Sequence, residues 1–360
     1  MEPAQAVNVT QSKIVSDLHT KVQVAQVPED VKLKLVEDLN RIELLMKSSQ
    51  YGPQVDTEIN YINFCCALPW MKTGTDVLDL NRAKTVLDKN HHGMDVIKDR
   101  ILEYLSVLIL NHNKNQVAHQ PVLAFVGLVG SGKTSIAYSI AEALGRPIIR
   151  IPFGGLGSAL QLRGESRIKA EAEPGLIMKA LKKSGVNNPV ILLDELDRVT
   201  EAARNDIMGV LVELLDPEQN MAFLDHYVGF PFDLSKLLFI ATANNTGNIS
   251  TAVLDRLELI EMPFYSDAQK VVIGRDYILP EALKNAGIDS KVIQIDPNLW
   301  PEIVRPLGFD GGIRSLKRNI DSLVRKIARK LVAGGSVPGM NISGGVFVIN
   351  AQNVHEYIQN

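Results

Sequence analysis

The stretch that decides the fold of this chain is a glycine-rich loop, Gly127-Leu128-Val129-Gly130-Ser131-Gly132-Lys133-Thr134. It matches the pattern G-x-x-x-x-G-K-[S/T], in which backbone amides curl around phosphate groups. An apolar run precedes the loop, and the segment after it has helical apolar spacing up to Gly145. This strand–loop–helix context is the one that a phosphate loop requires. We therefore expect Lys133 to reach the β- and γ-phosphates of a nucleotide and the Thr134 hydroxyl to bind Mg²⁺.

A second motif supplies two carboxylates at a sequence separation that suits such a loop. The apolar run 190–193 ends in Asp194 and Glu195, about 60 residues after the loop. A parallel strand delivers the side chains at its end to the edge of the sheet where ligands bind. We therefore expect Asp194 to hold the Mg²⁺ shell, and Glu195 to orient and polarise the attacking water.

Short apolar runs alternate with helical segments through the middle of the chain. They are rich in β-branched residues and lie at 122–126, 147–153, 190–193, 237–241 and 257–262. Strands that alternate with helices predict right-handed βαβ crossovers and a parallel sheet. Continuous apolar runs are typical of strands that are covered on both faces. The predicted fold class is therefore α/β.

Helical patterns flank this region on both sides. Before it, helices are predicted at 29–47, 55–67 and 93–110, whereas residues 1–20 are polar and are predicted to be a mobile start. After it, a capping box at 266–269 opens a helix toward Leu279. A basic helix at 312–332, a turn with glycine pairs, a strand at 345–349 and a helix at 351–358 follow. The predicted domains are a helical segment at 1–80, a nucleotide-binding α/β domain at 81–264 and a small helical domain at 265–360.

The composition is that of a globular protein without a strongly charged field. Of 360 residues, 46% are hydrophobic and 22% charged, and the net charge is −3. This charge disfavours general binding to nucleic acid or to an anionic membrane. The adjacent Cys65 and Cys66 predict buried free thiols in a reducing compartment. No apolar run approaches the roughly 20 residues that span a bilayer, so we expect a cytoplasmic protein, or a mitochondrial matrix protein if the source is eukaryotic.

The sequence resembles the ATPase module of the Lon proteases, which are ring-forming AAA+ proteins. The resemblance covers residues 28–358 and includes stretches that read Asp99-Arg-Ile-Leu-Glu-Tyr-Leu105, Leu215-Asp-Pro-Glu-Gln-Asn220 and Leu254-Asp-Arg-Leu-Glu-Leu-Ile260. It implies a P-loop AAA+ domain with three αβα layers, preceded by helices and followed by a small, mainly helical lid. It also implies ATP and Mg²⁺ as cofactors, a homo-oligomeric ring, expected to be hexameric, and unfolded or misfolded proteins as substrates.

The resemblance further assigns roles to residues whose motifs match. Asn244, in Ala241-Thr-Ala-Asn244, resembles the sensor-1 residue that helps to hold the attacking water; the alternative is an asparagine that caps the end of a strand. Arg314 resembles the sensor-2 arginine, which reports the nucleotide state to the lid. His91 and His92 occupy the segment that lies beside the adenine in the family.

Arg256 resembles the arginine finger, which reaches the γ-phosphate of a neighbouring subunit. A planar guanidinium suits this task because it neutralises charge that is spread over phosphate oxygens. The alternative is a surface ion pair with Asp255 or Glu258.

The sequence departs from the family pattern in two respects, the peptidase region and the pore loops. The Ser–Lys peptidase region of the family is not found in the 360 residues, so this chain alone is not expected to cut peptide bonds. Between Arg163-Gly164 and Pro174-Gly175, Lys169-Ala170-Glu171 stands where the family has an aromatic–aliphatic–glycine grip on polypeptide; near a second loop, Ile207 replaces a proline. These changes leave the ATP chemistry intact but weaken the expectation that substrate is pulled.

Several functions therefore remain open. The first is an ATP-driven motor module for Lon-like proteolysis. The others are a stand-alone ATP-dependent chaperone or remodelling factor, a nucleotide-switched scaffold with an altered pore loop, and a DNA initiator or clamp loader. The charge balance and the stretch 215–220 disfavour the last of these.

Overall fold

The computed structural model describes residues 3–47, 52–114, 121–169, 171–305, 312–332 and 346–358. The chain divides into two compact units. Unit 1 consists of Met1–Leu78, Val107–Ala124 and Ala141–Leu259, and unit 2 of Asp79–Ser106, Phe125–Ile140 and Ile260–Asn360. Each unit is thus assembled from three segments that are separated in the sequence.

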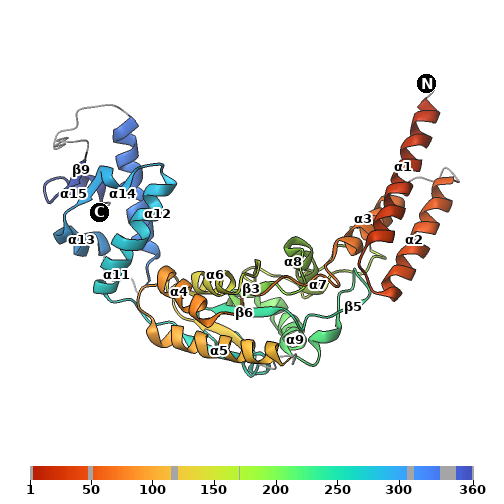
Figure 1. Ribbon diagram of the computed structural model, residues 1–360, viewed down its shortest axis with the longest axis horizontal. Helices are drawn as coiled ribbons and strands as arrows, with labels where there is room; N and C mark the ends of the chain where they lie inside the picture. The colour runs from red at the N-terminus through yellow and green to blue at the C-terminus, as the bar shows by residue number, and fades with distance from the viewer. Residues whose placement is uncertain are drawn as a thin grey trace. The chain divides into compact units, whose positions relative to one another are not determined.

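Three helices open unit 1: α1 (Pro3–Val24), α2 (Glu29–Lys47) and α3 (Pro53–Ala67). Each packs against the other two, and Figure 1 shows them side by side. The prediction of a mobile start at 1–20 is wrong, because this segment forms most of α1. Leu18 and Val22, four residues apart and thus on one face of α1, are both buried. Two apolar side chains on one helical turn are too weak a pattern to stand out from polar neighbours.

The predicted parallel sheet is confirmed. β1 (Val122–Val126), β2 (Ile148–Pro152), β3 (Val190–Asp194), β6 (Leu238–Ala243) and β7 (Leu257–Glu261) form a five-stranded sheet of order β2-β3-β6-β1-β7. In its parallel part, Ile148 pairs with Val190, and Val190 pairs with Leu238. Every residue of β3 and β6 is buried, which explains why these strands read as continuous apolar runs.

Helices and a short hairpin complete the surroundings of the sheet. The helices are α6 (Lys133–Leu144), α7 (Leu160–Arg163), α8 (Leu176–Ser184), α9 (Arg204–Leu215) and α10 (Thr251–Leu254). The hairpin pairs β4 (Phe223–Leu224) with β5 (Pro231–Phe232) in antiparallel orientation. Short 3₁₀ turns lie at Leu196–Arg198, Glu201–Ala203 and Asn220–Ala222.

The loop that follows α7 is fastened at its base by Asp225, whose side chain is fully buried. The Asp225 carboxylate accepts hydrogen bonds from the backbone amides of Gly175, Tyr227 and Val228. Gly164 has φ +75°, and a Cβ there would lie 2.7 Å from Asp225 Oδ1. Gly164 and Gly175 lie at the two ends of this loop. Both positions need glycine, because a side chain there would collide with the Asp225 carboxylate.

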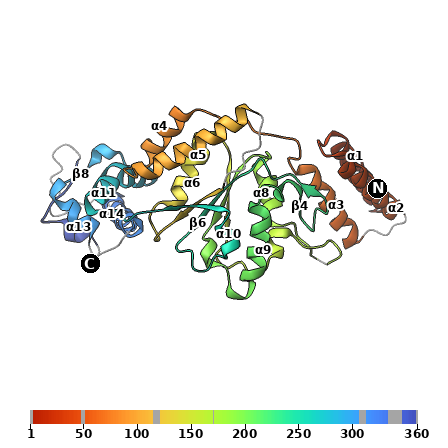
Figure 2. The same cartoon turned by 90° about the horizontal axis from the view of Figure 1, so that it is seen from below.

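Arg167 fastens the same loop to the N-terminal helices. Its guanidinium lies 3.6 Å from the centre of the Tyr61 ring, and its Nη1 lies 3.5 Å from one carboxylate oxygen each of Asp38 and Glu58. Tyr61 Oη in turn donates to the carbonyl oxygen of Val228 at 3.0 Å. Figure 2 shows α3 beside β4 accordingly. On α3, Cys65 is buried as predicted, whereas Cys66 is only half-buried.

Unit 2 contains the remaining elements. They are α4 (Leu80–Asn90), the start of α5 (Asp95–Asn113), α11 (Asp267–Ile273), a π-helical turn (Gly274–Ile278), α12 (Leu279–Asn285), α13 (Trp300–Val304), α14 (Arg314–Val332) and α15 (Val354–Tyr357). 3₁₀ turns lie at Ser290–Val292 and Pro297–Leu299, and β8 (Ile293–Ile295) pairs in parallel with β9 (Phe347–Ile349). Figure 1 shows α11 to α15 gathered together with β9.

Several sequence predictions for this unit need correction. Ser266 and Gln269 form the predicted capping box, but the helix does not end at Leu279. It continues through the π-helical turn Gly274–Ile278 to Asn285, and Pro280 lies in the first turn of α12, directly after that turn. Neither α4 nor β8 was predicted, and the last helix, predicted at 351–358, spans only Val354–Tyr357 in the structure. The predicted glycine-rich turn lies outside the described residues.

Within the described ranges, no helix combines the length with the hydropathy that crossing a membrane would require.

Candidate functional site

The predicted phosphate loop has a conformation that glycine favours at two positions. Gly130 has φ +83° and Gly132 has φ +95°, both in the left-handed region. Lys133 begins α6, and its Nζ donates to the carbonyl oxygens of Gly127 at 2.6 Å and Leu128 at 2.9 Å. The loop therefore combines a cation with the amino terminus of a helix, and both attract phosphate.

Two hydroxyl groups of unit 2 lie at the same loop. The Ser131 Oγ atom is buried and has no hydrogen-bond partner within the described ranges. Tyr265 Oη donates to the Ser131 carbonyl oxygen at 3.2 Å. Burial raises the pKa of Tyr265 to about 12, so the phenol remains a donor at neutral pH. An unpaired hydroxyl in this position fits a phosphate oxygen as its acceptor. Tyr265 was not predicted as part of the site, because no sequence motif marks it.

The start of α14 contacts the loop through its backbone. The amide of Ile313 donates to the carbonyl oxygen of Gly130 at 3.0 Å. A Cβ on Gly130 would lie 3.0 Å from the backbone nitrogen of Arg314, and a Cβ on Gly312 would lie 2.4 Å from the carbonyl oxygen of Val129. Arg314 therefore stands beside the phosphate loop, where a sensor of bound nucleotide belongs; its sensor-2 role stays a prediction.

His91 and His92 differ in their surroundings. His91 is buried, and its Nε2 lies 2.9 Å from Ser139 Oγ on α6. Burial, and secondarily the charge of Lys98, lower the pKa of His91 to about 4, so this imidazole is neutral at physiological pH. The His92 ring centre lies 6.4 Å from that of Tyr277. A neutral, packed imidazole is compatible with a neighbouring adenine, and the adenine-side role remains a prediction.

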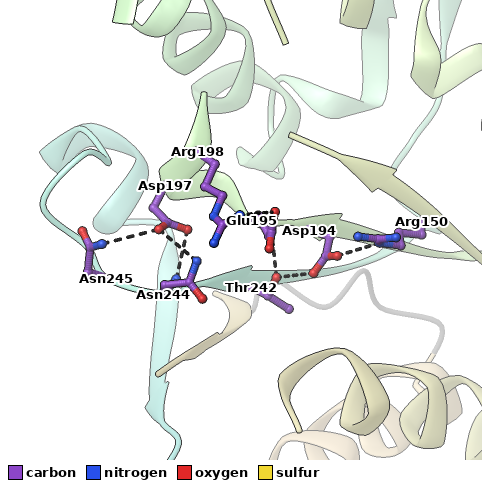
Figure 3. Close-up of polar contacts among 8 residues, drawn as sticks. All are labelled: Arg150, Asp194, Glu195, Asp197, Arg198, Thr242, Asn244 and Asn245. Carbon is purple, nitrogen blue, oxygen red and sulfur yellow. Dashed lines mark hydrogen bonds and ion pairs between the residues drawn. The ribbon is translucent and has the colours of Figure 1, made fainter. Parts of the chain in front are cut away.

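Asp194 and Glu195 lie in unit 1, at the end of β3. Asp194 is buried, and its Oδ2 accepts from Arg150 Nε on β2 at 2.6 Å. Thr242, on β6, donates its hydroxyl proton to Asp194 Oδ1 and accepts from the backbone N–H of Glu195 at 2.9 Å. Figure 3 shows this chain of contacts. No role was predicted for either Arg150, which lies within the predicted strand 147–153, or Thr242, which directly follows the predicted strand 237–241.

The backbone of Glu195 is in the left-handed region, with φ +61° and ψ +52°. For a residue with a Cβ this conformation costs about 1–2 kcal/mol. The hydrogen bond from its amide to Thr242 helps to hold it, and the carboxylate lies with Oε2 3.5 Å from Arg198 Nη1. Strain of this kind gathers at functional residues, which agrees with the predicted role of Glu195 in activating water.

Asn244 follows directly after β6 and is held by Asp197. Its backbone N–H donates to Asp197 Oδ1 at 2.9 Å, and its Nδ2 donates to Oδ2 at 3.3 Å. The structure therefore brings Asn244 to the segment that carries Glu195, as the sensor-1 prediction requires. Asp197 was missed, although it lies in the sequence two residues after Glu195.

Arg256 forms an ion pair within the chain. Its Nη2 lies 2.8 Å from Asp216 Oδ2, and its Nη1 donates to the carbonyl oxygen of Ala252. The hydrogen bond from Arg256 lowers the pKa of Asp216. The sequence-based alternative, a pair with Asp255 or Glu258, is thus wrong about the partner. Asp216 is distant in sequence, and no local pattern could have identified it.

Each unit thus contains one set of the predicted residues. Unit 2 brings together the phosphate loop, His91 and Arg314, and unit 1 brings together Asp194, Glu195 and Asn244. No group of three or more metal-ligating side chains occurs in the part of the chain that the structure describes. Thr134 lies in the first turn of α6, and the Asp194 carboxylate is buried and accepts hydrogen bonds from Arg150 and Thr242. Both side chains carry oxygen atoms, the ligand type that Mg²⁺ takes, and their role at a nucleotide-bound cation stays a prediction.

Comparison with known proteins decides the family. The family described as ATPases associated with various cellular activities (AAA) matches residues 123–264, and the Lon protease AAA+ ATPase lid domain matches residues 284–338. The Lon protease of Lawsonia intracellularis is 41% identical over 324 residues, which is 90% of this chain and 38% of that protein. The chain belongs to the Lon family of AAA+ ATPases.

Other Lon relatives match at the same level. Lon protease 1 of Bacillus subtilis is 40% identical over 89% of this chain and 40% of its own length. The protein named Lon protease homolog 2, peroxisomal, of Danio rerio is 40% identical over 89% of this chain and 37% of its own length. The chain therefore spans about two fifths of the curated relatives that it matches.

Proposed function

We propose that this Lon-type chain binds ATP with Mg²⁺ and hydrolyses it to ADP and phosphate. The observation that carries the proposal is the phosphate loop, with its two left-handed glycines, the inward-folded Lys133 and the unpaired Ser131 hydroxyl. Mg²⁺ that arrives with ATP neutralises charge on the β- and γ-phosphates. We assign Thr134 and Asp194 to its shell, Glu195 and Asn244 to the attacking water, and His91 and His92 to the adenine side.

Replacing Lys133 with alanine tests the nucleotide site directly. We expect the dissociation constant for a fluorescent ADP to rise about tenfold or more, because the variant loses its charge partner for the phosphates. The measurement is a fluorescence titration. The matched control is Lys183→Ala, which removes an exposed lysine at the end of α8 and should bind like the parent. Unchanged affinity in Lys133→Ala would contradict the assignment of the loop.

We further propose that ATP hydrolysis drives the handling of unfolded polypeptide for proteolysis, in a homo-oligomeric ring that is hexameric. The proposal rests on family membership, since the relatives are named as proteases. The alternative, a remodelling factor or a nucleotide-switched scaffold, is favoured by the loop 164–175. There, Lys169 pairs with Glu165 at 3.6 Å, and Glu171 takes φ +63°; Ala170 lies outside the described residues.

The loop provides a test between these functions. Ile168, Lys169 and Glu171 are the described residues at the tip of the loop, 168–171; Ile168 is 96% exposed and the other two are charged. A charged tip buries little apolar area against a passing chain. We expect the parent to unfold a tagged fluorescent substrate slowly, and Lys169→Tyr/Ala170→Ile to unfold it several-fold faster at the same ATPase rate. Ile168→Ser, made in the parent, should slow it further. Fast unfolding by the parent that neither change affects would contradict this role of the loop.

A further inference from the structure

We propose that Asp197 is a positioning residue for hydrolysis, which turns the amide of Asn244 so that its oxygen accepts a hydrogen bond from the attacking water. Asp197 lies in the 3₁₀ turn Leu196–Arg198, and its side chain is buried, with 6% exposed. The inference rests on the proposed ATP hydrolysis. It names Asp197 as the group that determines which end of the Asn244 amide faces the attacking water.

One carboxylate holds Asn244 at two points. Asp197 Oδ1 accepts from the backbone N–H at 2.9 Å, and Oδ2 accepts from the side-chain Nδ2 at 3.3 Å. The first bond fixes the backbone at the end of β6, and the second fixes the rotation of the side chain. Because Asp197 is only two residues from Glu195, this contact also sets Asn244 relative to the group that we assign to water activation.

The loop after β6 closes around Asp197 with two more side chains. Asn245 Nδ2 lies 3.4 Å from Asp197 Oδ2, and Asn248 Nδ2 donates to the Asp197 carbonyl oxygen at 3.2 Å. Figure 3 shows Asn244 and Asn245 converging on the same carboxylate. These contacts order the loop. Of the three asparagines, only Asn244 is assigned to the attacking water.

The chemistry of the two side chains determines which end of the amide faces the water. An ionised carboxylate only accepts hydrogen bonds, whereas an amide has a donor end and an acceptor end. The Asn244 NH₂ group must therefore face Asp197, and Oδ1 points away from it, as Figure 3 shows. With its amide held in this way, Asn244 acts on water as an acceptor.

The hydrolysis step then has defined partners. The water oxygen forms a bond to the γ-phosphorus while the bond from that phosphorus to the β,γ-bridging oxygen breaks, which releases ADP. One water proton passes to Glu195 and later leaves to solvent. The other O–H of the water donates to Asn244 Oδ1 and transfers no proton.

The test is the isosteric variant Asp197→Asn. The amide that replaces the carboxylate can present either a donor or an acceptor to the side chain of Asn244. The rotation of the Asn244 amide is therefore no longer fixed. We expect kcat for ATP to fall roughly 10- to 100-fold, because a misaligned group at the water costs rate rather than affinity. KM for ATP and the dissociation constant for ADP should stay at parent values. Parental kcat in a folded Asp197→Asn protein would overturn the proposal.

A double-mutant cycle separates positioning from a merely structural role. In an Asn244→Ala background, Asp197→Asn should reduce kcat no further, because its target is already gone. An undiminished additional loss would overturn the proposal. Asn245→Ala, which removes another donor to the same carboxylate, is the matched control and should keep parental kcat; a loss equal to that of Asp197→Asn would assign the effect to loop order.

A second pair of variants covers the case in which Asp197→Asn does not fold. Asn244→Thr has a hydroxyl that donates to Asp197 and accepts from water, whereas the isosteric Asn244→Val has neither property. We expect the threonine variant to hydrolyse ATP several-fold faster than the valine variant, and equal rates would contradict the inference. A parent that binds ATP but never hydrolyses it would contradict the proposed function itself, so the two failures are distinguishable.

Discussion

Replacing Glu195 with glutamine is expected to abolish most ATP turnover while nucleotide binding stays intact. The amide fills the same space at the end of β3, but it cannot take a proton from water. The backbone of Glu195 is held by Thr242, with φ +61°, and this contact involves only main-chain atoms of Glu195. We therefore expect kcat to fall about 100-fold or more without a change in local structure.

The measurement combines steady-state phosphate release with a fluorescent ADP titration. Glu201→Gln is the matched control, because it makes the same change on an exposed glutamate in the nearby turn Glu201–Ala203. Parental turnover in Glu195→Gln would show that another group activates the water. Loss of both binding and turnover would instead indicate a structural role for this residue.

The sequence could predict those parts of the fold that depend on local pattern. The first four residues of β3, Val190 to Leu193, are apolar because the whole strand is buried, and the two carboxylates Asp194 and Glu195 follow directly after them. The phosphate loop was also predictable from local sequence. Its glycines adopt left-handed backbone conformations, and Lys133 contacts a carbonyl oxygen only six residues away.

The missed features depend on contacts between distant segments. Thr242 bridges Asp194 and Glu195 from another strand, and Asp197 holds Asn244 across 47 positions. β8 has three residues and forms only because β9 pairs with it. α4 has few apolar residues, of which Ala83 and Leu87 are buried. Such features leave too little local signal for a pattern to detect.

Replacing Arg256 with alanine is expected to abolish ATP hydrolysis in an assembled ring while each subunit keeps its own Glu195. If Arg256 acts as a finger, its guanidinium neutralises γ-phosphate charge in the neighbouring subunit's site, and such a group is worth about 10³-fold or more in turnover. Arg256→Lys should be almost as inactive, because an ammonium cannot reproduce the planar fork. Turnover by each variant, at concentrations where sedimentation shows the same assembly as the parent, is the measurement.

The ion pair with Asp216 supplies the competing explanation and also the control. The Arg256 and Asp216 side chains are 27% and 20% exposed, and a pair that is partly open to water contributes about 1 kcal/mol or less. Asp216→Asn removes this pair but leaves the guanidinium. Near-parental turnover in Asp216→Asn beside an inactive Arg256→Ala would therefore favour the finger, whereas equal losses of stability and activity in both would favour an intrachain role.

Mixing two inactive variants decides whether Arg256 acts between subunits. Arg256→Ala keeps Glu195, and Glu195→Gln keeps Arg256, so a site between one subunit of each kind can contain both groups. In an equal random mixture about one site in four regains them in a head-to-tail ring. Activity should therefore return in the mixture, and only after subunits have exchanged. If every mixture stays inactive while a proven monomer of the parent hydrolyses ATP at full rate, Arg256 serves its own subunit through Asp216, and the active site is complete within one chain.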